Sequence, residues 1–160
     1  MKKPTSLRTA LTAALPEIRN DPTRLAIWIE DGAVRARQTA THSFAFKYPL
    51  SILLREVSTD IAIVSHAINR WLRRHQPDLL AGGADETYKF ETEILDNGTA
   101  DILFTVELTE GVSIAQNDDE SWAVEYLEEP DPLFVDDGPV GGNAGTPPLK
   151  GIDAIIADDV

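Results

Sequence analysis

The feature that most constrains this 160-residue chain is an alternation in which every second side chain is large and apolar: Phe44, Phe46, Tyr48, Leu50, Ile52 and Leu54. Such alternation is typical of a β-strand that buries one face. A strand over residues 43–57 would be about 50 Å long at about 3.3 Å per residue, whereas a domain of about 100 residues has a radius of gyration of about 13 Å. We therefore predict that this strand overhangs its own domain or bends. Pro49 lacks a ladder donor and favours a bulge or a sheet edge there.

Helical periodicity flanks this strand on both sides. On its N-terminal side the pattern predicts a helix over residues 7–18, capped by Thr5 or Ser6, that kinks or restarts at Pro16. On its C-terminal side a second apolar stripe predicts a helix over residues 61–72, preceded by capping residues and followed by a proline.

Period-two patterns predict four further strands. Residues 24–30 and 33–39 flank Asp31-Gly32, which predicts a hairpin turn, and residues 88–95 and 101–108 flank a second turn. The resulting order is α-β-β-β-α-β-β. It predicts an α+β fold of two layers, with both helices on one face of a mainly antiparallel sheet.

The charge of the chain is concentrated near its C-terminal end. The net charge is −13, and residues 117–160 carry twelve acids against one base, Lys150, which accounts for −11 of it. The same segment is rich in proline and contains a glycine-rich run over residues 138–145. Because such a composition buries too little apolar surface to offset its ordering entropy, we predict a domain over residues 1–116 and an extended acidic C-terminal arm over residues 117–160.

The residues that would carry catalysis, a cofactor or a metal are missing. The absence of cysteine excludes disulfides, thiolate metal sites and cysteine nucleophiles. No nucleophile elbow or phosphate-binding glycine motif is present. The histidines (His42, His66 and His75) form no helical metal-binding pair, and the acidic run at 118–120 lacks the spacing of a calcium loop. We predict no catalytic, cofactor-binding or metal-binding residues, and no enzymatic activity.

The charge and hydropathy of the chain also limit the classes of partner that it can bind. A chain this acidic gains little from nucleic-acid phosphates and is repelled by an anionic membrane. The positively charged start is not followed by the apolar run of a signal peptide, and no stretch approaches the ~20 apolar residues that span a bilayer. We expect a soluble protein that stays inside a cell and contacts no membrane.

Basic side chains on the predicted strands and at the end of the second helix are candidates for an interface: Arg35, Arg37, Lys47, Arg55, Arg73 and Arg74. One interpretation is that they only keep the surface soluble and complement a helix C-terminus. The other is that the nearly neutral body is polarised, so that its basic patches receive acidic segments of neighbouring copies.

The acidic arm carries large apolar groups among its carboxylates, and four of them are further interface candidates: Trp122, Tyr126, Leu133 and Phe134. This pattern is found in peptides that anchor on a partner and order only on binding. Plain disorder of the arm explains its composition equally well, and both interpretations stand.

Three segments of the body resemble one known family. They are the opening Met1-Lys-Lys-x-x-Ser-Leu-Arg8, the aromatic strand Phe44-x-Phe-x-Tyr48, and above all Trp71-Leu-Arg-Arg-His-Gln-Pro-Asp-Leu-Leu80. In this order they look like the tail completion protein R family of peduovirus-type contractile-tailed phages. The resemblance covers residues 1–116 and leaves the acidic arm unmatched.

The resemblance implies a structural protein of the virion with a small α+β domain, no catalytic residues and no cofactor. It implies a tail terminator: a homo-oligomeric ring, expected to be a hexamer, that caps the head-proximal end of the tail tube and stops its polymerisation. Implied partners are the tail tube protein, the sheath protein and the head-tail connector. Double-stranded DNA would pass through the lumen without specific binding.

This interpretation places the protein at the neck of the virion, after assembly in the cytoplasm of the host bacterium. A different class of function stays open, in which the chain is an acidic adaptor or DNA-mimic protein that binds a basic partner.

Overall fold

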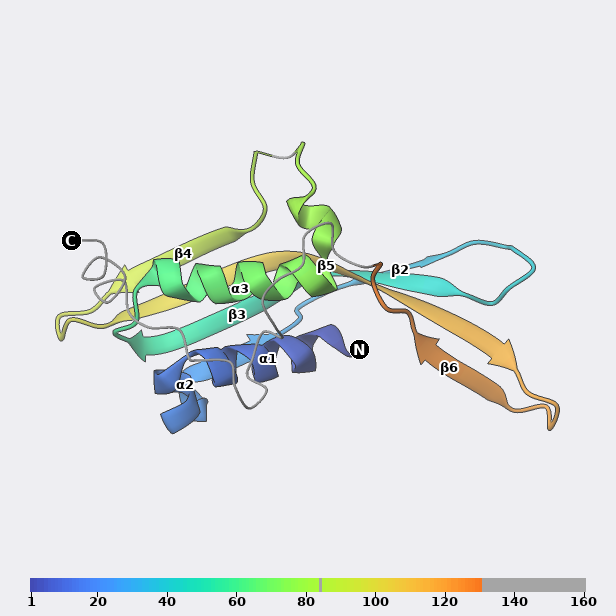
Figure 1. Cartoon of the computed structure of the whole chain (residues 1–160), viewed down its shortest axis with the longest axis horizontal. Helices are drawn as coiled ribbons and strands as arrows, with labels where there is room; N and C mark the ends of the chain where they lie inside the picture. Colours follow the sequence, from blue (N-terminus) through green and yellow to red (C-terminus); the bar gives the residue numbers. More distant parts are fainter. Residues whose placement is uncertain (84, 131–160) are drawn as a thin grey trace.

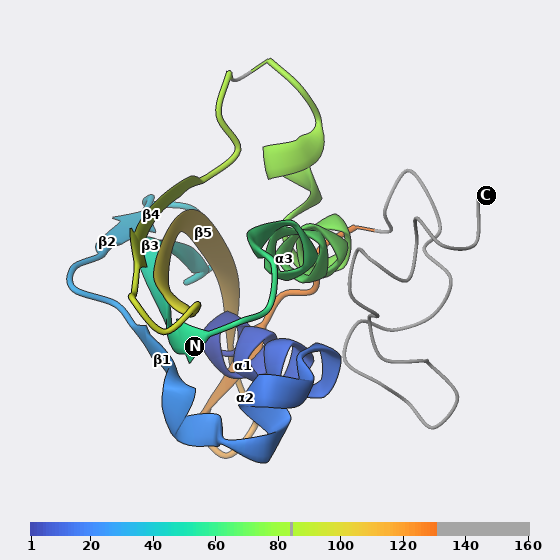
Figure 2. The same cartoon turned by 90° about the vertical axis from the view of Figure 1, so that its left-hand side faces the viewer.

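Two layers make up the protein in the computed structural model, which describes residues 1–83 and 85–130 (Figures 1 and 2). One layer is a six-stranded sheet in which every pairing is antiparallel. The other consists of helices that all cover the same face of the sheet (Figure 2). The predicted α+β class with helices on one face is confirmed.

The sheet is built on two long strands, β3 (Phe44–Val57) and β5 (Ala100–Gln116), which pair along most of their length. Each bears two shorter strands in succession on its outer side. These are β1 (Leu25–Trp28) and β2 (Ala33–Ala36) on β3, and β4 (Lys89–Ile94) and β6 (Trp122–Tyr126) on β5. The described sheet therefore has four outer strands and no long continuous edge.

The helical layer consists of α1 (Lys3–Ala14), α2 (Pro16–Asn20) and α3 (Ile61–His75), with short 3-10 turns at η1 (Pro22–Arg24) and η2 (Pro77–Leu80). The helix break predicted at Pro16 is confirmed, because Pro16 starts a new helix at a position where its missing N–H costs nothing. Asp60 caps α3 by accepting a 2.7 Å hydrogen bond from Ala62 N.

The start of α1 differs from the prediction of a cap at Thr5 or Ser6. The helix begins at Lys3, its N-cap Lys2 makes no side-chain cap bond, and Pro4 lies in the first turn. Proline favours the first helical turn, so the helix can begin earlier than the apolar pattern alone indicates.

The core lies between the helices and the even-numbered face of β3 and β5. Its fully buried members come from both strands and from the helical layer, and include Tyr48, Leu50, Ile52, Leu54, Phe104, Val106, Leu108, Leu7, Leu11, Leu15, Ile18, Val64, Ile68, Trp71 and Leu72. The odd-numbered residues of both strands lie on the opposite, helix-free face, except for Val57, which follows the register shift in β3 and is part of the core. Period-two burial along the strands and helical periodicity along α3 thus meet in one core.

The long strands extend past the helices, so that the β2–β3 hairpin and the β5–β6 hairpin project from one end of the molecule (Figure 1). We call this end the overhang. The pairing of β3 with β5 runs unbroken through Pro49, and the register shifts only between Leu54 and Val57. The strand therefore overhangs its domain, and Pro49 causes no bulge.

Hydrogen-bond alternation explains why Pro49 is tolerated. The backbone groups of Thr109 and Gly111 bond away from β3, to side chains and to Leu127. Because the ladder alternates, Pro49 opposite Glu107 also directs its nitrogen away from β5, into the gap between β1 and β2. No ladder bond is lost there.

The hairpin predicted at Asp31-Gly32 is wrong. Strands β1 and β2 do not pair with each other; both are antiparallel to β3 and follow one another along it. A Cβ on Gly32 would lie 3.3 Å from Tyr48 Cβ, so glycine lets the connection pass close over β3. The Asp31-Gly32 pair therefore lets the chain pass close to β3 and does not reverse its direction.

A sixth strand was not predicted. Strand β5 continues well past the predicted end at residue 108, and β6 lies inside the segment 117–160 assigned to the acidic arm. Trp122, Val124 and Tyr126 alternate along it, but the strand is short and lies among acids, a composition that favours an extended arm. The rest of the arm, including Leu133 and Phe134, lies outside the described residues.

Candidate interaction surfaces

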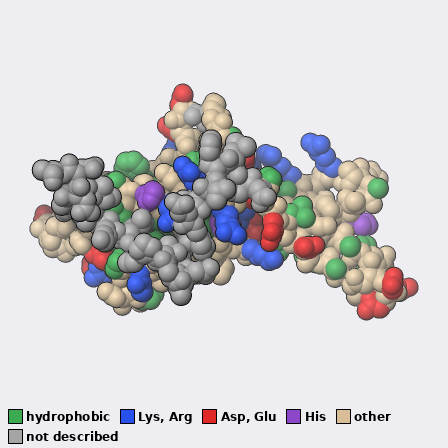
Figure 3. Space-filling model, viewed as in Figure 1, with side chains coloured by type: hydrophobic (Ala, Val, Ile, Leu, Met, Phe, Trp, Pro, Cys, Tyr) green, Lys and Arg blue, Asp and Glu red, His purple; other side chains and the backbone are tan. Residues whose placement is uncertain are grey.

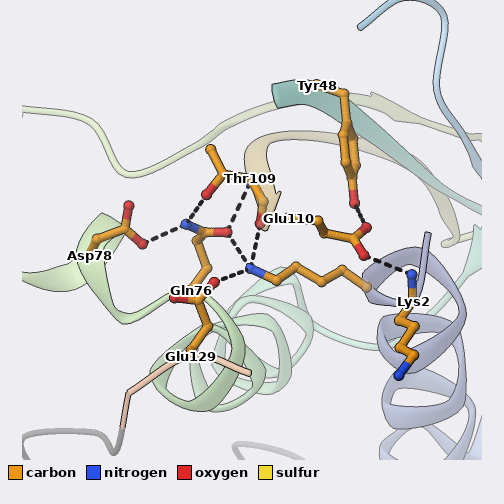
Figure 4. A network of polar contacts seen from close by, with 8 residues as sticks. Lys2, Tyr48, Gln76, Asp78, Thr109, Glu110 and Glu129 are labelled. Carbon is orange, nitrogen blue, oxygen red and sulfur yellow. Dashed lines mark hydrogen bonds and ion pairs between the residues drawn. The ribbon is translucent and has the colours of Figure 1, made fainter. Parts of the chain in front are cut away.

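A buried polar network joins the two layers (Figure 4). At its centre, the Lys3 ammonium is buried and donates to three oxygens: Gln76 Oε1 at 2.7 Å, the Thr109 carbonyl at 2.6 Å and Glu129 Oε1 at 2.6 Å. Every N–H donor of this ammonium is therefore used, and its positive charge is paired with the Glu129 carboxylate. These are the conditions under which burial of a lysine is tolerated.

Gln76, which is also buried, serves as the hub between α3 and β5. Its Oε1 accepts from Thr109 N at 3.0 Å in addition to Lys3, and its Nε2 donates to Thr109 Oγ1 at 2.9 Å and to Asp78 Oδ1 at 2.5 Å. All four of its side-chain hydrogen-bonding positions are occupied. Together, Gln76 and Lys3 satisfy the backbone of Thr109 in the gap between β4 and β6.

A buried carboxylate anchors the N-terminus. Glu110 accepts hydrogen bonds from the Tyr48 hydroxyl and from Lys2 N, the latter at 2.8 Å. Burial, together with this carboxylate as acceptor, raises the pKa of the Tyr48 phenol above its ordinary value. Tyr48 therefore stays a neutral donor at pH 7.

These contacts unite the three segments on which the family resemblance was drawn. Lys3 comes from the opening motif, Tyr48 from the aromatic strand and Gln76 from the Trp71–Leu80 motif. A further bond, from Trp71 Nε1 to Ser6 Oγ at 3.0 Å, joins the first motif to the last. The motif residues thus lock the helices onto the sheet, and no buried side-chain polar atom among the described residues is left unpaired for chemistry.

The apolar and charge patterns of the sequence do not reveal this network. The signal that the sequence contains is a lysine and a glutamine at the boundary of apolar patterns, where buried polar groups need partners from distant segments.

His75 lies beside this network, stacked on Trp71 with 4.7 Å between ring centroids. Burial, with Arg74 and Lys3 nearby, lowers the pKa of His75, which keeps the ring neutral at pH 7.

The overhang carries opposite charges on its two hairpins. Residues 33–47, which include β2, hold three bases and no acid, whereas residues 113–126, which include β6, hold four acids and no base. Figure 3 shows this separation as basic side chains over β2 and acidic side chains at the tip of the β5–β6 hairpin. None of the side chains of Arg35, Arg37 and Glu125 forms an ion pair among the described residues.

Apolar side chains are exposed on the same hairpins. Val34 on β2 is 62% exposed, and on β6 Trp122 is 51% and Val124 is 62% exposed. Their register partners Phe46, Gln116 and Ile114 belong to the even-numbered face of the long strands. The face that the helices cover elsewhere is therefore left apolar and uncovered at the overhang.

The basic candidates do not form one patch. Arg35, Arg37 and Lys47 belong to the β2–β3 hairpin of the overhang, Arg55 lies near the opposite end of β3, and Arg73 and Arg74 are exposed in the last turn of α3. The structure therefore brings Arg35, Arg37 and Lys47 to the same end of the molecule as Trp122.

The two aromatic candidates on β6 have different environments. The Trp122 ring meets the ring of His42 edge to face, at 4.9 Å between centroids, and the side chain is half exposed. Tyr126 is engaged within the chain, since its hydroxyl accepts from the N-terminal ammonium at 2.7 Å and Lys2 Nζ lies 5.7 Å from its ring centroid. Trp122 is thus the aromatic side chain of β6 that is available to a partner.

Among the described residues, no three His, Cys, Asp or Glu side chains come together in a way that could hold a metal ion. Within the same ranges, none of the helices has the length and apolar character needed to cross a membrane.

Comparison with known proteins supports the family resemblance drawn from the sequence. Residues 1–130 match the model of a family described as P2 phage tail completion protein R (GpR). The tail completion protein R of Escherichia phage P2 is 29% identical over 134 residues, which cover 82% of this chain and 86% of the phage P2 protein. No solved structure matches the chain.

Proposed function

Because the chain belongs to the P2 phage tail completion protein R family, whose members are non-enzymatic structural proteins of the phage tail, we propose that it is the tail terminator. In this role, copies of the chain form a ring, expected to be a hexamer, on the head-proximal end of the tail tube. The ring stops polymerisation of the tube and presents a surface to the head-tail connector.

The observation that carries this proposal is the overhang. A sheet that extends past its helices, with exposed apolar residues on the face that the helices cover elsewhere, is incomplete as a single copy. A ring made from one kind of chain needs two different surfaces that fit each other, because only a heterologous contact can close around an axis. The oppositely charged hairpins provide two such surfaces.

Other surfaces are available for the remaining tail components. Arg73 and Arg74 are exposed in the last turn of α3, at the end of this helix that lies toward the overhang (Figure 1), and we assign them to contacts with the tube or sheath protein. The acidic arm, with Leu133 and Phe134 as apolar anchors, is proposed to cross a neighbouring subunit or the sheath. The negative charge of every copy keeps double-stranded DNA from adhering as it passes through the lumen.

Electron microscopy of particles tests this function. We expect rings at the junction between tail and head, and we expect a phage that lacks the protein to make tails of abnormal length that do not join heads. Tails of normal length joined to heads without the protein would contradict the proposal. A monomer that is absent from particles and co-purifies with a basic host protein would support the acidic adaptor instead.

A further inference from the structure

We propose that the outer edge of β2 in one copy pairs antiparallel with the outer edge of β6 in the next copy, so that the sheets of neighbouring subunits become continuous. The inference rests on the ring proposed above and identifies the segments that close it. It is drawn from three properties of these two strands: their unpaired backbone groups, their exposed side chains and their charges.

Both strands have an unpaired backbone edge within the described residues. Since the odd-numbered residues of β5 direct their backbone groups toward β6, Ala123 and Glu125 bond to β5. The N–H and C=O groups of Trp122 and Val124 then face outward. By the same alternation, Ala33 and Arg35 bond to β3, while Val34 and Ala36 face outward. No hydrogen bond to these outward groups is made by the described residues.

The side chains of the two strands complement each other on both faces of the sheet. On the side of the helices, β2 presents Val34 and β6 presents Trp122 and Val124, all of them more than half exposed. On the helix-free face, β2 presents Arg35 and β6 presents Glu125. Continuation of the sheet places apolar residues beside apolar residues on one face and opposite charges together on the other.

Charge also excludes the symmetric alternatives. Pairing β2 with a second β2 would bring Arg35 and Arg37 against the same residues of the neighbour, and pairing β6 with a second β6 would oppose two Glu125 side chains and two acidic turns. Like charges on adjacent strands destabilise a sheet, and charged edge strands are a common protection against unwanted pairing. The contact of β2 with β6 is head-to-tail, which is the type that closes a ring.

The other outer strands fit less well. The edge of β1 is partly covered, because Arg8 Nη1 donates to the Leu25 carbonyl at 3.0 Å. Strand β4 is open and exposes Phe90 and Ile94, but it carries Glu91 and Glu93 and lies at the end of the sheet away from the overhang. It therefore provides a matched control: an exposed, acidic edge strand that the proposal leaves outside the interface.

The chain contains no cysteine, so introduced cysteines report strand contacts without background. Full-length chains with Val34→Cys or Ala36→Cys are mixed with chains carrying Trp122→Cys or Val124→Cys, and are oxidised under conditions in which they assemble. Adjacent antiparallel strands place Cα atoms about 4.5–5.5 Å apart, within disulfide reach. We expect covalent dimers from these mixtures, and none when Thr92→Cys on β4 replaces the β6 variant.

A proline scan tests the backbone bonds. Val124→Pro removes an N–H that faces the open edge, so the chain should fold while its self-association weakens at least tenfold. Thr92→Pro makes the same change at the open edge of β4 and should leave association unchanged.

Charge reversal tests the side-chain pair on the helix-free face. Glu125→Arg alone should weaken self-association, and its combination with Arg35→Glu should restore the affinity to within about threefold of that of the unaltered chain.

The outcomes separate this inference from the proposed function. Rings in micrographs without crosslinks between β2 and β6, or equal losses from Val124→Pro and Thr92→Pro, would overturn the β2–β6 contact and leave the ring intact. A chain that forms neither rings nor crosslinks, alone or on tails, would overturn both.

Discussion

At the scale of single residues, the interior of this protein is held by a lysine and a carboxylate that sequence patterns assign to the surface. The Lys3 ammonium meets an amide oxygen, a backbone carbonyl and the Glu129 carboxylate, each within 2.7 Å. Removing one partner from a buried charged cluster leaves the others unsatisfied, and that loss exceeds the value of any single hydrogen bond.

We therefore predict that Lys3→Met lowers the free energy of unfolding by about 3 kcal/mol. Methionine keeps most of the side-chain volume but leaves Gln76 Oε1, the Thr109 carbonyl and Glu129 without their shared donor. Urea unfolding, followed by tryptophan fluorescence with Trp71 buried in the core, measures the change.

Lys2→Met is the matched control, because the Lys2 ammonium lies on the surface above the Tyr126 ring. It should change the unfolding free energy by less than about 0.5 kcal/mol. Equal effects of the two variants would show that the buried network does not stabilise the fold in the way its geometry indicates.

At the scale of elements, a single carboxylate in the first turn of α2 is joined to the segment that leads into α3. Glu17 on α2 accepts from the backbone N–H and the hydroxyl of both Ser58 and Thr59, at 2.6 to 3.1 Å. Partial burial alone would raise the pKa of Glu17, but these hydrogen bonds outweigh it and lower the pKa from 4.5 to about 2.

A carboxyl group whose pKa is lowered by folding stabilises the protein at every pH above its unfolded pKa, and the stabilisation disappears as the pH falls through the folded value. Glu17→Gln should lower the unfolding free energy by about 1–2 kcal/mol at pH 7. The difference from the unaltered protein should stay constant down to about pH 4.5 and shrink toward pH 2.

Glu93→Gln, in an exposed strand, provides the comparison for that titration and should show no such pH-dependent difference. Urea midpoints at closely spaced pH values measure all three proteins. A gap for Glu17→Gln that stays constant down to pH 2 would mean that the carboxylate is not held by the Ser58-Thr59 segment.

The same scale shows which elements the sequence reveals. Strand β3 and helix α3 have one buried face each, so their apolar periodicity predicts them. The Asp31-Gly32 pair has the composition of a hairpin turn, but β3 is long enough to pair β1 and β2 in succession, and tertiary pairing overrides the local preference. Strand β6 alternates Trp122, Val124 and Tyr126 with smaller or charged residues, but its five residues lie in an acidic segment whose composition favours an extended arm.

At the scale of the whole molecule, the charge separation between hairpins depends on how distant segments are placed. Residues 33–47 and 113–126 are far apart in the sequence, and only the pairing of β3 with β5 brings them to one end. The sequence could predict the basic candidates Arg35 and Arg37 individually. It could not predict that β6 carries the complementary edge, because that requires the register of the central strands.

The structure also changes where the folded body ends. A body ending at residue 116 would lose β6, and with it the Leu127 N–H bond to the Gly111 carbonyl and the Glu129 partner of buried Lys3.

We predict that a chain of residues 1–130 unfolds with the same free energy as the full chain, within about 0.5 kcal/mol. A chain of residues 1–116 should lose at least about 3 kcal/mol or fail to fold, since it leaves Lys3 without its carboxylate and uncovers one side of β5. Circular dichroism and urea unfolding of the three chains measure this. If the 1–116 chain were as stable as the full one, β6 would belong to the acidic arm and not to the body, and the complementary edge proposed for it would have no fixed place on the sheet.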